Sequence, residues 1–391
     1  MKLSIPFTIW ISALVLIIAL GAQAAFVVFT EGLTVTGMNN IVPWGLWITV
    51  DLSSIALSAG AFMVSATVYM FKIEKYKPVT RVAVFLGLIG YTMAVLSLLL
   101  DIGQPLRFWH TLAYWNTHSV LWEVSMCITL YTMVLGVEFL PIVGESENFK
   151  RLPMLHKLGG KLHDVMPFFA FMGAILSLLH QASLGAIYGV VSARPIWYKP
   201  NMPVMFITSA MAAGPALIIL VSLITSTIMR RDVIKTQLLS DLGKISGFAL
   251  IVYLFIKAWD IVAMSYQYLP LRSEALALLI TGPNSPWFWG GEIILGGMIP
   301  AVILIFPRLR HSKTGLFTAS LFITAGLVIN RWNVTVSGLI IPPLSIIQIG
   351  RYAPTWAEWI TTAGVLAFGA LAYTIGIKII PIFQSEDMSY E

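Results

Sequence analysis

Charged residues are scarce in this sequence, and the scarcity decides its class before any motif is considered. Lys, Arg, Asp and Glu make up 11% of the 391 residues, whereas 58% are hydrophobic and the mean hydropathy is +0.85. Soluble globular chains carry about a quarter charged residues, so a soluble domain of any size is excluded. The formal charge of +6 does not indicate nucleic acid, because Lys and Arg also collect at the cytoplasmic ends of membrane helices.

Residues that bind metals and haem are also few. The single cysteine, Cys127, excludes an intrachain disulfide, an iron–sulfur cluster and a structural zinc site, and its apolar surroundings are typical of a core residue. Of the six histidines, only His180 lies well inside an apolar segment, so no bis-histidine haem site can be assembled in the membrane. The sequence has no glycine-rich phosphate loop and no metal-spaced Cys/His cluster. Any electron carrier must therefore be a lipid-soluble molecule or a cofactor on a partner.

Long apolar runs, by contrast, are abundant. They fall near residues 6–30, 44–71, 82–101, 118–143, 165–191, 203–229, 245–268, 287–307, 314–334 and 357–382. Each is long enough to cross a bilayer, which needs about 20 apolar residues in a helix. The first run resembles a signal peptide as far as Ala24, but it stays apolar beyond that point and is predicted to be a membrane helix. We therefore predict an all-α integral membrane protein with ten transmembrane helices, in a single polytopic domain over residues 1–391.

The connections between the predicted helices differ in charge. Fifteen Lys and Arg residues lie in the connections after the second, fourth, sixth and eighth helices, against six in the connections after the odd-numbered helices. Basic loops stay on the cytoplasmic side, so both termini are predicted to be cytoplasmic. The outer connections are rich in Trp, Tyr and Pro and poor in charge, which is typical either of an aromatic belt at the interface or of a docking surface for another subunit.

Ionisable residues inside the predicted helices gather on one side of the membrane. The outer half is expected to hold Asp51, Asp101, Glu123, His180, Lys257, Asp260, Glu292 and Arg331. The inner half holds Glu138 and Asp164, both near helix ends where they could reach water. Charges within a bilayer are costly and mark functional sites by default, so the outer half is predicted to be the functional side.

Several of these residues also have a purely structural explanation. Lys257 and Asp260 are three residues apart on one helix face and could neutralise each other. Asp101 and Arg331 lie close enough to the interface to be solvated. Asp51 could hold helices together through hydrogen bonds.

A purely structural role explains Glu123 and His180 less well, so a functional role is favoured for these two residues. Each lies in an otherwise apolar helix, where an unpaired ionised carboxylate would neutralise or find a partner. A quinone head group needs hydrogen-bond donors and acceptors near the interface, and oxidation of a quinol releases two protons that need a base. A histidine and a carboxylate in an apolar pocket supply both.

Four local strings carry a family resemblance. They are Pro43-Trp44-Gly45-Leu46-Trp47-Ile48 followed by Asp51, Asp101-Ile102-Gly103-Gln104-Pro105 with Arg107-Phe108-Trp109, Ser119-Val120-Leu121-Trp122-Glu123, and His180-Gln181-Ala182-Ser183-Leu184-Gly185. In this order they resemble the NrfD/PsrC family of quinone-interacting membrane subunits of complex iron–sulfur oxidoreductases. The resemblance is to its ten-helix members in hydrogenase and sulfate-reducer complexes. Gln104 stands where many members have Arg, which leaves open any anion-pairing role at that position.

The resemblance implies a fold, a cofactor and partners. The family is described as two four-helix bundles, here helices 2–5 (about 44–191) and 6–9 (about 203–334), flanked by peripheral helices at 6–30 and 357–382. It holds no haem or iron–sulfur cluster of its own and binds quinone, expected here to be menaquinone. A ferredoxin-like subunit with four-iron clusters docks on the outer, periplasmic face of the prokaryotic inner membrane, just above the quinone site. A multihaem cytochrome c and further membrane or catalytic subunits are candidate additional partners.

The resemblance and the residue pattern together assign roles. The residues expected to act chemically are His180, Glu123, Asp51 and Asp101. Those expected to bind the quinone are His180, Gln181, Trp122, Arg331 and Asn330. A second polar cluster, either a vestigial site or part of a proton route, consists of Lys257, Asp260 and Glu292. His180 is expected to hydrogen-bond a quinone oxygen and exchange its proton, Glu123 to pass protons toward the outer surface, and Arg331 or Asn330 to form the far wall of the pocket.

An internal repeat is also indicated. An Asp lies at or near the end of the third and seventh helices, and a Glu lies about one turn into the fourth and eighth. An offset of four helices preserves orientation in the membrane, so the repeat would be parallel.

Two other functions share some of these sequence features. A secondary transporter has similar repeats and intramembrane charges, but it predicts polar groups near the membrane centre that both sides can reach, and the inner half here is nearly empty of charge. A purely structural anchor for a redox partner would not need His180 inside the bilayer. We therefore predict the quinone-site subunit of a respiratory electron-transfer complex, which is not an enzyme by itself.

Overall fold

The computed structural model describes residues 5–146, 165–266, 272–340 and 350–383. Within these ranges the regular elements are all helices, and ten of them are long and apolar enough to cross a membrane. The predicted all-α membrane class and number of spans are therefore confirmed. Asp164, which was predicted to lie in the inner half, falls outside the described residues.

The ten spans follow the predicted apolar runs closely. They are α1 (Ile5–Glu31), α2 (Leu46–Phe71), α3 (Lys77–Asp101), α5 (Val120–Gly144), α7 (Met166–Gly189), α8 (Met202–Met229), α9 (Thr236–Tyr266), the π-helix η6 (Trp287–Met298) continued by α11 (Ile299–Ile305), α13 (Lys313–Trp332) continued by the π-helix η7 (Asn333–Ser337), and α15 (Trp356–Ile379). Only α9 begins much earlier than predicted. Its first turns contain Gln237, Asp241 and Lys244, and these polar turns precede the apolar run.

Short helices in the connections were not predicted. They are α4 (His110–Ala113), α10 (Arg272–Ile280) and α12 (Pro307–Arg310), whereas α14 (Gly338–Ile340) directly continues η7 at the end of the ninth span. None is long enough to cross a membrane.

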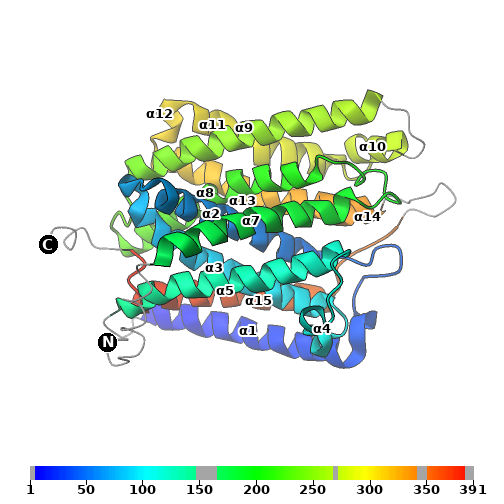
Figure 1. Cartoon of the computed structure of the whole chain (residues 1–391), viewed down its shortest axis with the longest axis horizontal. Helices are drawn as coiled ribbons and strands as arrows, with labels where there is room; N and C mark the ends of the chain where they lie inside the picture. The colour runs from blue at the N-terminus through cyan, green and yellow to red at the C-terminus, as the bar shows by residue number, and fades with distance from the viewer. Residues whose placement is uncertain (1–4, 147–164, 267–271, 341–349, 384–391) are drawn as a thin grey trace.

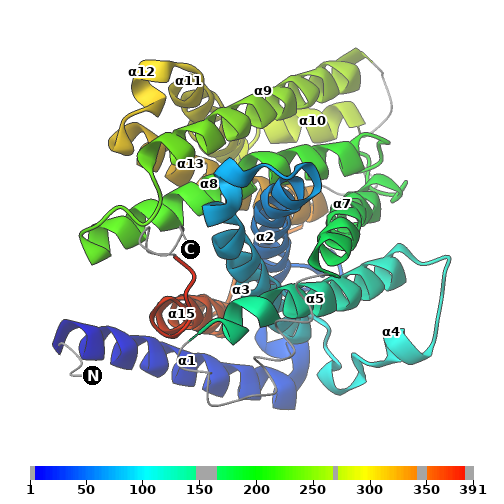
Figure 2. The ribbon, with the colours of Figure 1, turned by 60° about the vertical axis from the view of Figure 1, so that its left-hand side comes forward.

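The helices pack in two groups and a peripheral pair. Helix α2 packs against α3, α7 and α8, and α5 packs against α3 and α7. Helix α8 also packs against α9 and α13, and α13 packs against η6 and α11. We call α2, α3, α5 and α7 the first bundle, and α8, α9, η6–α11 and α13 the second bundle. Helices α1 and α15 pack on each other beside the first bundle, on the side away from α9 and α11 (Figure 2).

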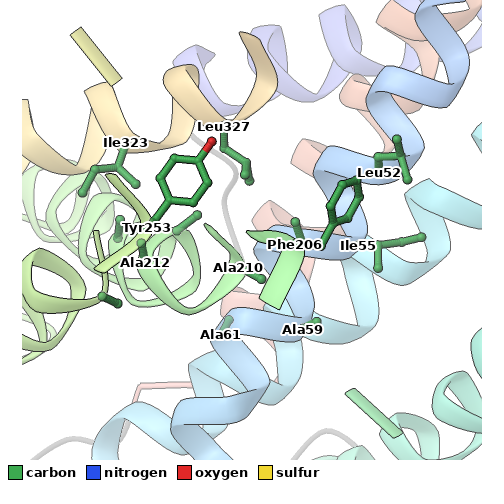
Figure 3. Close-up of a cluster of buried hydrophobic side chains, with 14 of the residues drawn as sticks. Leu52, Ile55, Ala59, Ala61, Phe206, Ala210, Ala212, Tyr253, Ile323 and Leu327 are labelled. Atoms are coloured by element: carbon green, nitrogen blue, oxygen red, sulfur yellow. The ribbon is translucent and has the colours of Figure 1, made fainter. Parts of the chain in front are cut away.

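Small residues bring the two bundles into close contact. Gly60 of α2 and Gly214 of α8 meet so closely that a Cβ on Gly214 would lie 1.9 Å from the carbonyl carbon of Gly60. Figure 3 shows alanines of the same two helices beside this crossing. Because lipid offers no hydrophobic driving force between helices, close van der Waals contact of this kind stabilises their association.

The two ends of the molecule differ in which connections they carry. Helices α4, α10 and α14 lie at one end, whereas α12, the start of α1 and the end of α15 lie at the other (Figure 1). The described connections after α2, α8 and α11, which are rich in basic residues, share the second end. Following the predicted topology, we call the end with α4, α10 and α14 the outer end and the opposite one the inner end.

Candidate functional site

A cavity of about 620 Å³ lies at the outer end of the first bundle. Its lining comes from α2, α3, α4, α5 and α7 and is mostly aliphatic and aromatic, with Asp51 and Asp101 among the polar side chains. Ile102, Tyr114 and Leu121 belong to the lining and are also exposed at the surface, so they form its rim. A concave, mainly apolar cavity of this size with a few polar groups has the general form of a small-molecule site.

Local sequence features hold the rim in place. Gly103 has a φ of +70°, a left-handed conformation that glycine adopts without strain, and the chain turns there from α3 toward α4. Ser119 caps α5 by accepting a hydrogen bond from the backbone N–H of Trp122 at 3.4 Å. The indole N–H of Trp122 donates to the carbonyl oxygen of Thr111 at 3.0 Å. These contacts tie the segment around α4 to α5 and place Trp122 in the cavity wall.

The two carboxyl groups of the cavity each keep one oxygen without a partner. Oδ1 of Asp51 and Oδ1 of Asp101 are buried and have no hydrogen-bond partner among the described residues. Asp51 also interacts electrostatically with Asp101 across the cavity lining. Because nearly all buried polar atoms in proteins are hydrogen-bonded, these oxygens are suited to binding water, a proton or a polar ligand group.

His180 and Glu123 lie outside the cavity lining, where two contacts join α7 to its neighbours. The ring Nδ1 of His180 is 2.9 Å from the hydroxyl of Tyr91 on α3. Three residues further along α7, the hydroxyl of Ser183 donates to Glu123 of α5 at 2.6 Å. His180 is fully buried, one turn inward from the cavity-lining Leu184, and its Nε2 has no partner among the described residues.

Gln181 is likewise fully buried and outside the cavity lining. Neither the oxygen nor the nitrogen of its side-chain amide has a hydrogen-bond partner within the described part of the chain. Of the residues predicted for the first-bundle site, the structure thus brings Asp51, Asp101 and Trp122 to the cavity, and it places His180, Gln181 and Glu123 around it.

The second bundle repeats the same two contacts with different residues. Asn330 of α13 donates to the hydroxyl of Tyr253 on α9 at 3.0 Å. Three residues further along the chain, Asn333 donates to Glu292 of η6 at 2.8 Å. Here α13 takes the place of α7, α9 that of α3, and η6 that of α5. This geometry supports the parallel repeat that the acidic residues indicated.

Glu292 differs from its first-bundle counterpart in being fully partnered. Besides Asn333, it accepts a hydrogen bond from Asn330 at 2.9 Å and lies 2.8 Å from the ammonium group of Lys257. Glu123 forms no ion pair within the described residues. The second bundle therefore neutralises its glutamate, whereas no described residue of the first bundle does so.

The suggested pairing of Lys257 with Asp260 is wrong. Asp260 forms a buried ion pair with Lys199, from the connection between α7 and α8, and accepts a hydrogen bond from Asn201 at 3.0 Å. Lys257 pairs with Glu292 instead. Burial lowers the pKa of Lys199, although the neighbouring Asp260 opposes that shift. Spacing along one helix permits a pair, but here partners from other elements lie closer.

Arg331 and Asn330 belong to the second bundle, and neither lines the cavity. The guanidinium of Arg331 donates to Asn330 and to Ser209, each at 2.8 Å, and lies 3.9 Å from the ring centre of Phe206. Phe206 stacks on Tyr188 with 5.7 Å between ring centres, and Tyr188 lines the cavity. Arg331 thus supports the cavity wall through two aromatic rings.

Three residues of interest were not assigned to the site from the sequence. His110 was placed in the outer connection, but it lines the same cavity as the two carboxyl groups. Tyr91 could be named from the sequence only as one of several polar residues that a through-membrane proton route would need, because its contact with His180 depends on which helices face each other. Glu138 was expected to reach water, yet it is 5% exposed and neither carboxyl oxygen has a partner among the described residues.

Comparison with known proteins gives a family match and several similar proteins. The family described as "Polysulphide reductase, NrfD" matches residues 34–343. The protein is 36% identical over 393 aligned positions to the menaquinone reductase integral membrane subunit of Nitratidesulfovibrio vulgaris, covering 97% of this sequence and 93% of that protein. It is 25% identical over 391 positions to the Hdr-like menaquinol oxidoreductase integral membrane subunit of Archaeoglobus fulgidus, covering 96% and 93%. It is also 24% identical over 310 positions to one subunit of the polysulfide reductase of Wolinella succinogenes, covering 76% and 95%.

Proposed function

The chain belongs to the polysulphide reductase NrfD family, and we propose that it is the membrane subunit of a quinone-interacting oxidoreductase complex. Its quinone site is the 620 Å³ cavity of the first bundle. The observation that carries this assignment is an apolar, aromatic cavity with two carboxyl groups whose buried oxygens lack protein partners among the described residues. Two of the similar proteins are named for menaquinone or menaquinol, which supports menaquinone as the quinone.

The cavity lining suits a quinone ring and its isoprenoid tail. Trp44, Trp122 and Tyr188 offer aromatic faces to a planar ring, and Asp51 and Asp101 offer polar groups to its oxygens. The exposed apolar rim leads to the surface, where a tail could continue into lipid. A bound quinone supplies the redox chemistry, by taking up or releasing two electrons and two protons.

The surrounding residues handle protons. Asp51 and Asp101 bind the protons that leave or reach the cavity, since each has a carboxyl oxygen without a partner in the described part of the structure. Tyr91 lies 2.9 Å from His180, which is one turn inward from the cavity-lining Leu184, so the tyrosine and histidine form a polar pair on the inner side of the cavity. Glu123 is half-buried and has no cation partner among the described residues, and it connects the cavity to the outer surface.

The electron-transfer partner docks at the outer end. Beside the cavity, the segment 105–115 exposes several large apolar side chains, of which Leu106 is 88% exposed. Contiguous exposed apolar surface of this kind marks interaction sites. An iron–sulfur subunit seated there would stand directly above the quinone site, in keeping with the family resemblance. The basic loops at the inner end support cytoplasmic termini and an inner-membrane location.

The second bundle serves as a structural copy without a quinone site. Its two cavities near Glu292 measure about 40 and 30 Å³, too small for a quinone ring. Lys257 neutralises Glu292, and Asn330, Asn333 and Tyr253 donate hydrogen bonds to its carboxylate. No specific observation favours a transporter.

The test is turnover with quinol or quinone in the purified complex. Asp51→Asn and Asp101→Asn are expected to abolish quinone-dependent turnover while the complex still assembles, because the carboxamide cannot carry the proton. Glu74→Gln, in the exposed connection after α2, is the matched control and should leave turnover unchanged. Normal turnover in both cavity variants would contradict the assignment, and it is the result that a purely structural anchor predicts.

A further inference from the structure

A second large cavity, of about 600 Å³, lies at the inner end of the second bundle, between the end of α8 and the start of α13. Its lining includes three basic side chains, Arg230, Arg231 and Lys313, and one carboxylate, Asp232. Hydroxyl groups and the ring of Phe317 complete the wall. Nothing in the quinone chemistry of the first bundle makes use of this cavity.

We propose that this cavity binds the headgroup of an anionic phospholipid through its phosphodiester oxygens. Three cations against one carboxylate leave an excess of two positive charges in the lining. Lys313 lies 2.6 Å from Asp232, and the two arginines form no ion pair among the described residues. Arginine binds phosphate oxygens with two parallel hydrogen bonds, and basic pockets between membrane helices on the cytoplasmic side hold anionic headgroups. The excess of two charges fits a headgroup with two phosphodiesters, as in diphosphatidylglycerol.

The helices beside the cavity favour a lipid over free phosphate. Ile224 and Ile228 lie one turn apart on α8, and Phe317 and Leu321 lie one turn apart on α13; all four are exposed. Side chains four residues apart share a helix face, so each helix presents an apolar stripe that runs from the inner end toward the middle of the molecule. Helices α8 and α13 pack side by side. Acyl chains can lie along these stripes while the headgroup occupies the basic cavity, whereas a free phosphate ion would leave the stripes unused.

The proposal is tested with the full complex, purified and stripped of lipid in detergent. Diphosphatidylglycerol, phosphatidylcholine and inorganic phosphate are each added, and binding is followed by native mass spectrometry and by the midpoint of thermal unfolding. Diphosphatidylglycerol is expected to bind and raise the midpoint, and the other two are not. The double variant Arg230→Gln with Arg231→Gln should bind at least tenfold more weakly, because each charge near the surface contributes about 1 kcal/mol.

Two further variants separate a specific site from general charge or misfolding. Arg230→Lys with Arg231→Lys keeps the charge and should retain most of the binding. Lys72→Gln removes a basic residue at the end of α2, where the chain has the same left-handed backbone as at Arg230 but Lys72 lines none of the large cavities. It should bind as the wild type does. Undiminished binding in the double glutamine variant would overturn the proposal. So would equal stabilisation by inorganic phosphate, which would make the ligand a free anion.

Discussion

Glu292 and Glu123 occupy equivalent places in the two bundles, and the same change to glutamine is expected to affect them in opposite ways. Glu292 lies 2.8 Å from Lys257 and accepts hydrogen bonds from Asn330 and Asn333. Glu123 is half-buried and accepts one hydrogen bond, from Ser183 at 2.6 Å. We expect Glu292→Gln to destabilise the protein with little direct effect on chemistry, and Glu123→Gln to impair turnover with little effect on stability.

The expected loss of stability depends on which side chains lose a partner in each variant. Glu292→Gln leaves the ammonium group of Lys257, which is 7% exposed, without its counter-charge. Removing one partner of a buried ion pair costs about 3–5 kcal/mol. Glutamine at position 123 still accepts the hydrogen bond from Ser183, and no buried cation loses a partner, so the cost there should stay below about 1.5 kcal/mol.

The assay is a comparison of purified complexes by thermal unfolding and by quinone-dependent turnover. Glu292→Gln should lower the unfolding midpoint clearly, and the added change Lys257→Met should restore part of it, because no unpaired charge then stays buried. Glu123→Gln should unfold near the wild-type midpoint while turnover falls at least tenfold. If Glu292→Gln instead unfolds like the wild type and loses turnover, the second cluster acts in the chemistry and the reasoning from its ion pair is refuted.

Three further predictions test other parts of the structure. Tyr91→Phe removes the hydroxyl that contacts His180 and should slow turnover and shift its pH profile without loss of assembly. Gly214→Ala places a Cβ 1.9 Å from the backbone of α2 and should lower yield and the unfolding midpoint, whereas Gly290→Ala, with open space around it, should not. Leu106→Asp should weaken co-purification of the electron-transfer partner while the chain itself still inserts and folds, and full retention of the partner would contradict docking at this segment.

The membrane-spanning helices could be predicted because a helix that crosses a bilayer must be apolar over a continuous stretch of sequence. A crossing helix needs about 20 apolar residues in a row, and that run is visible without any knowledge of neighbours. The start of α9 was missed because its polar first turns do not belong to the apolar run. Helices α4 and α10 were missed because helices in connections follow no bilayer constraint.

The sequence could predict single site residues, but it could not predict which residues contact each other. An ionisable residue in an apolar helix is conspicuous, so Asp51 and Asp101 were found, and both line the cavity. Pairing depends on which helices pack together, and Lys257 and Asp260 show the consequence: each takes a partner from a segment far away in the sequence. The role of Tyr91 depends in the same way on a neighbour from another helix.

The internal repeat allows the two bundles to be compared residue by residue. Both use a residue on the fourth helix to bind a tyrosine on the second, and a residue three positions later to bind a glutamate on the third. In the second bundle Lys257 forms an ion pair with that glutamate, and the cavity beside the pair has a volume of about 40 Å³. In the first bundle no cation pairs with the glutamate within the described residues, and a cavity of about 620 Å³ lies close by. If a glutamate that is the counter-ion of a buried lysine took up a proton, the charge of the lysine would be left without a partner. A glutamate without a cation partner can take up and release protons at no such cost. We therefore propose that the ion pair of Lys257 makes the second bundle a structural support, and that its absence among the described residues leaves the first bundle available for proton exchange with a ligand.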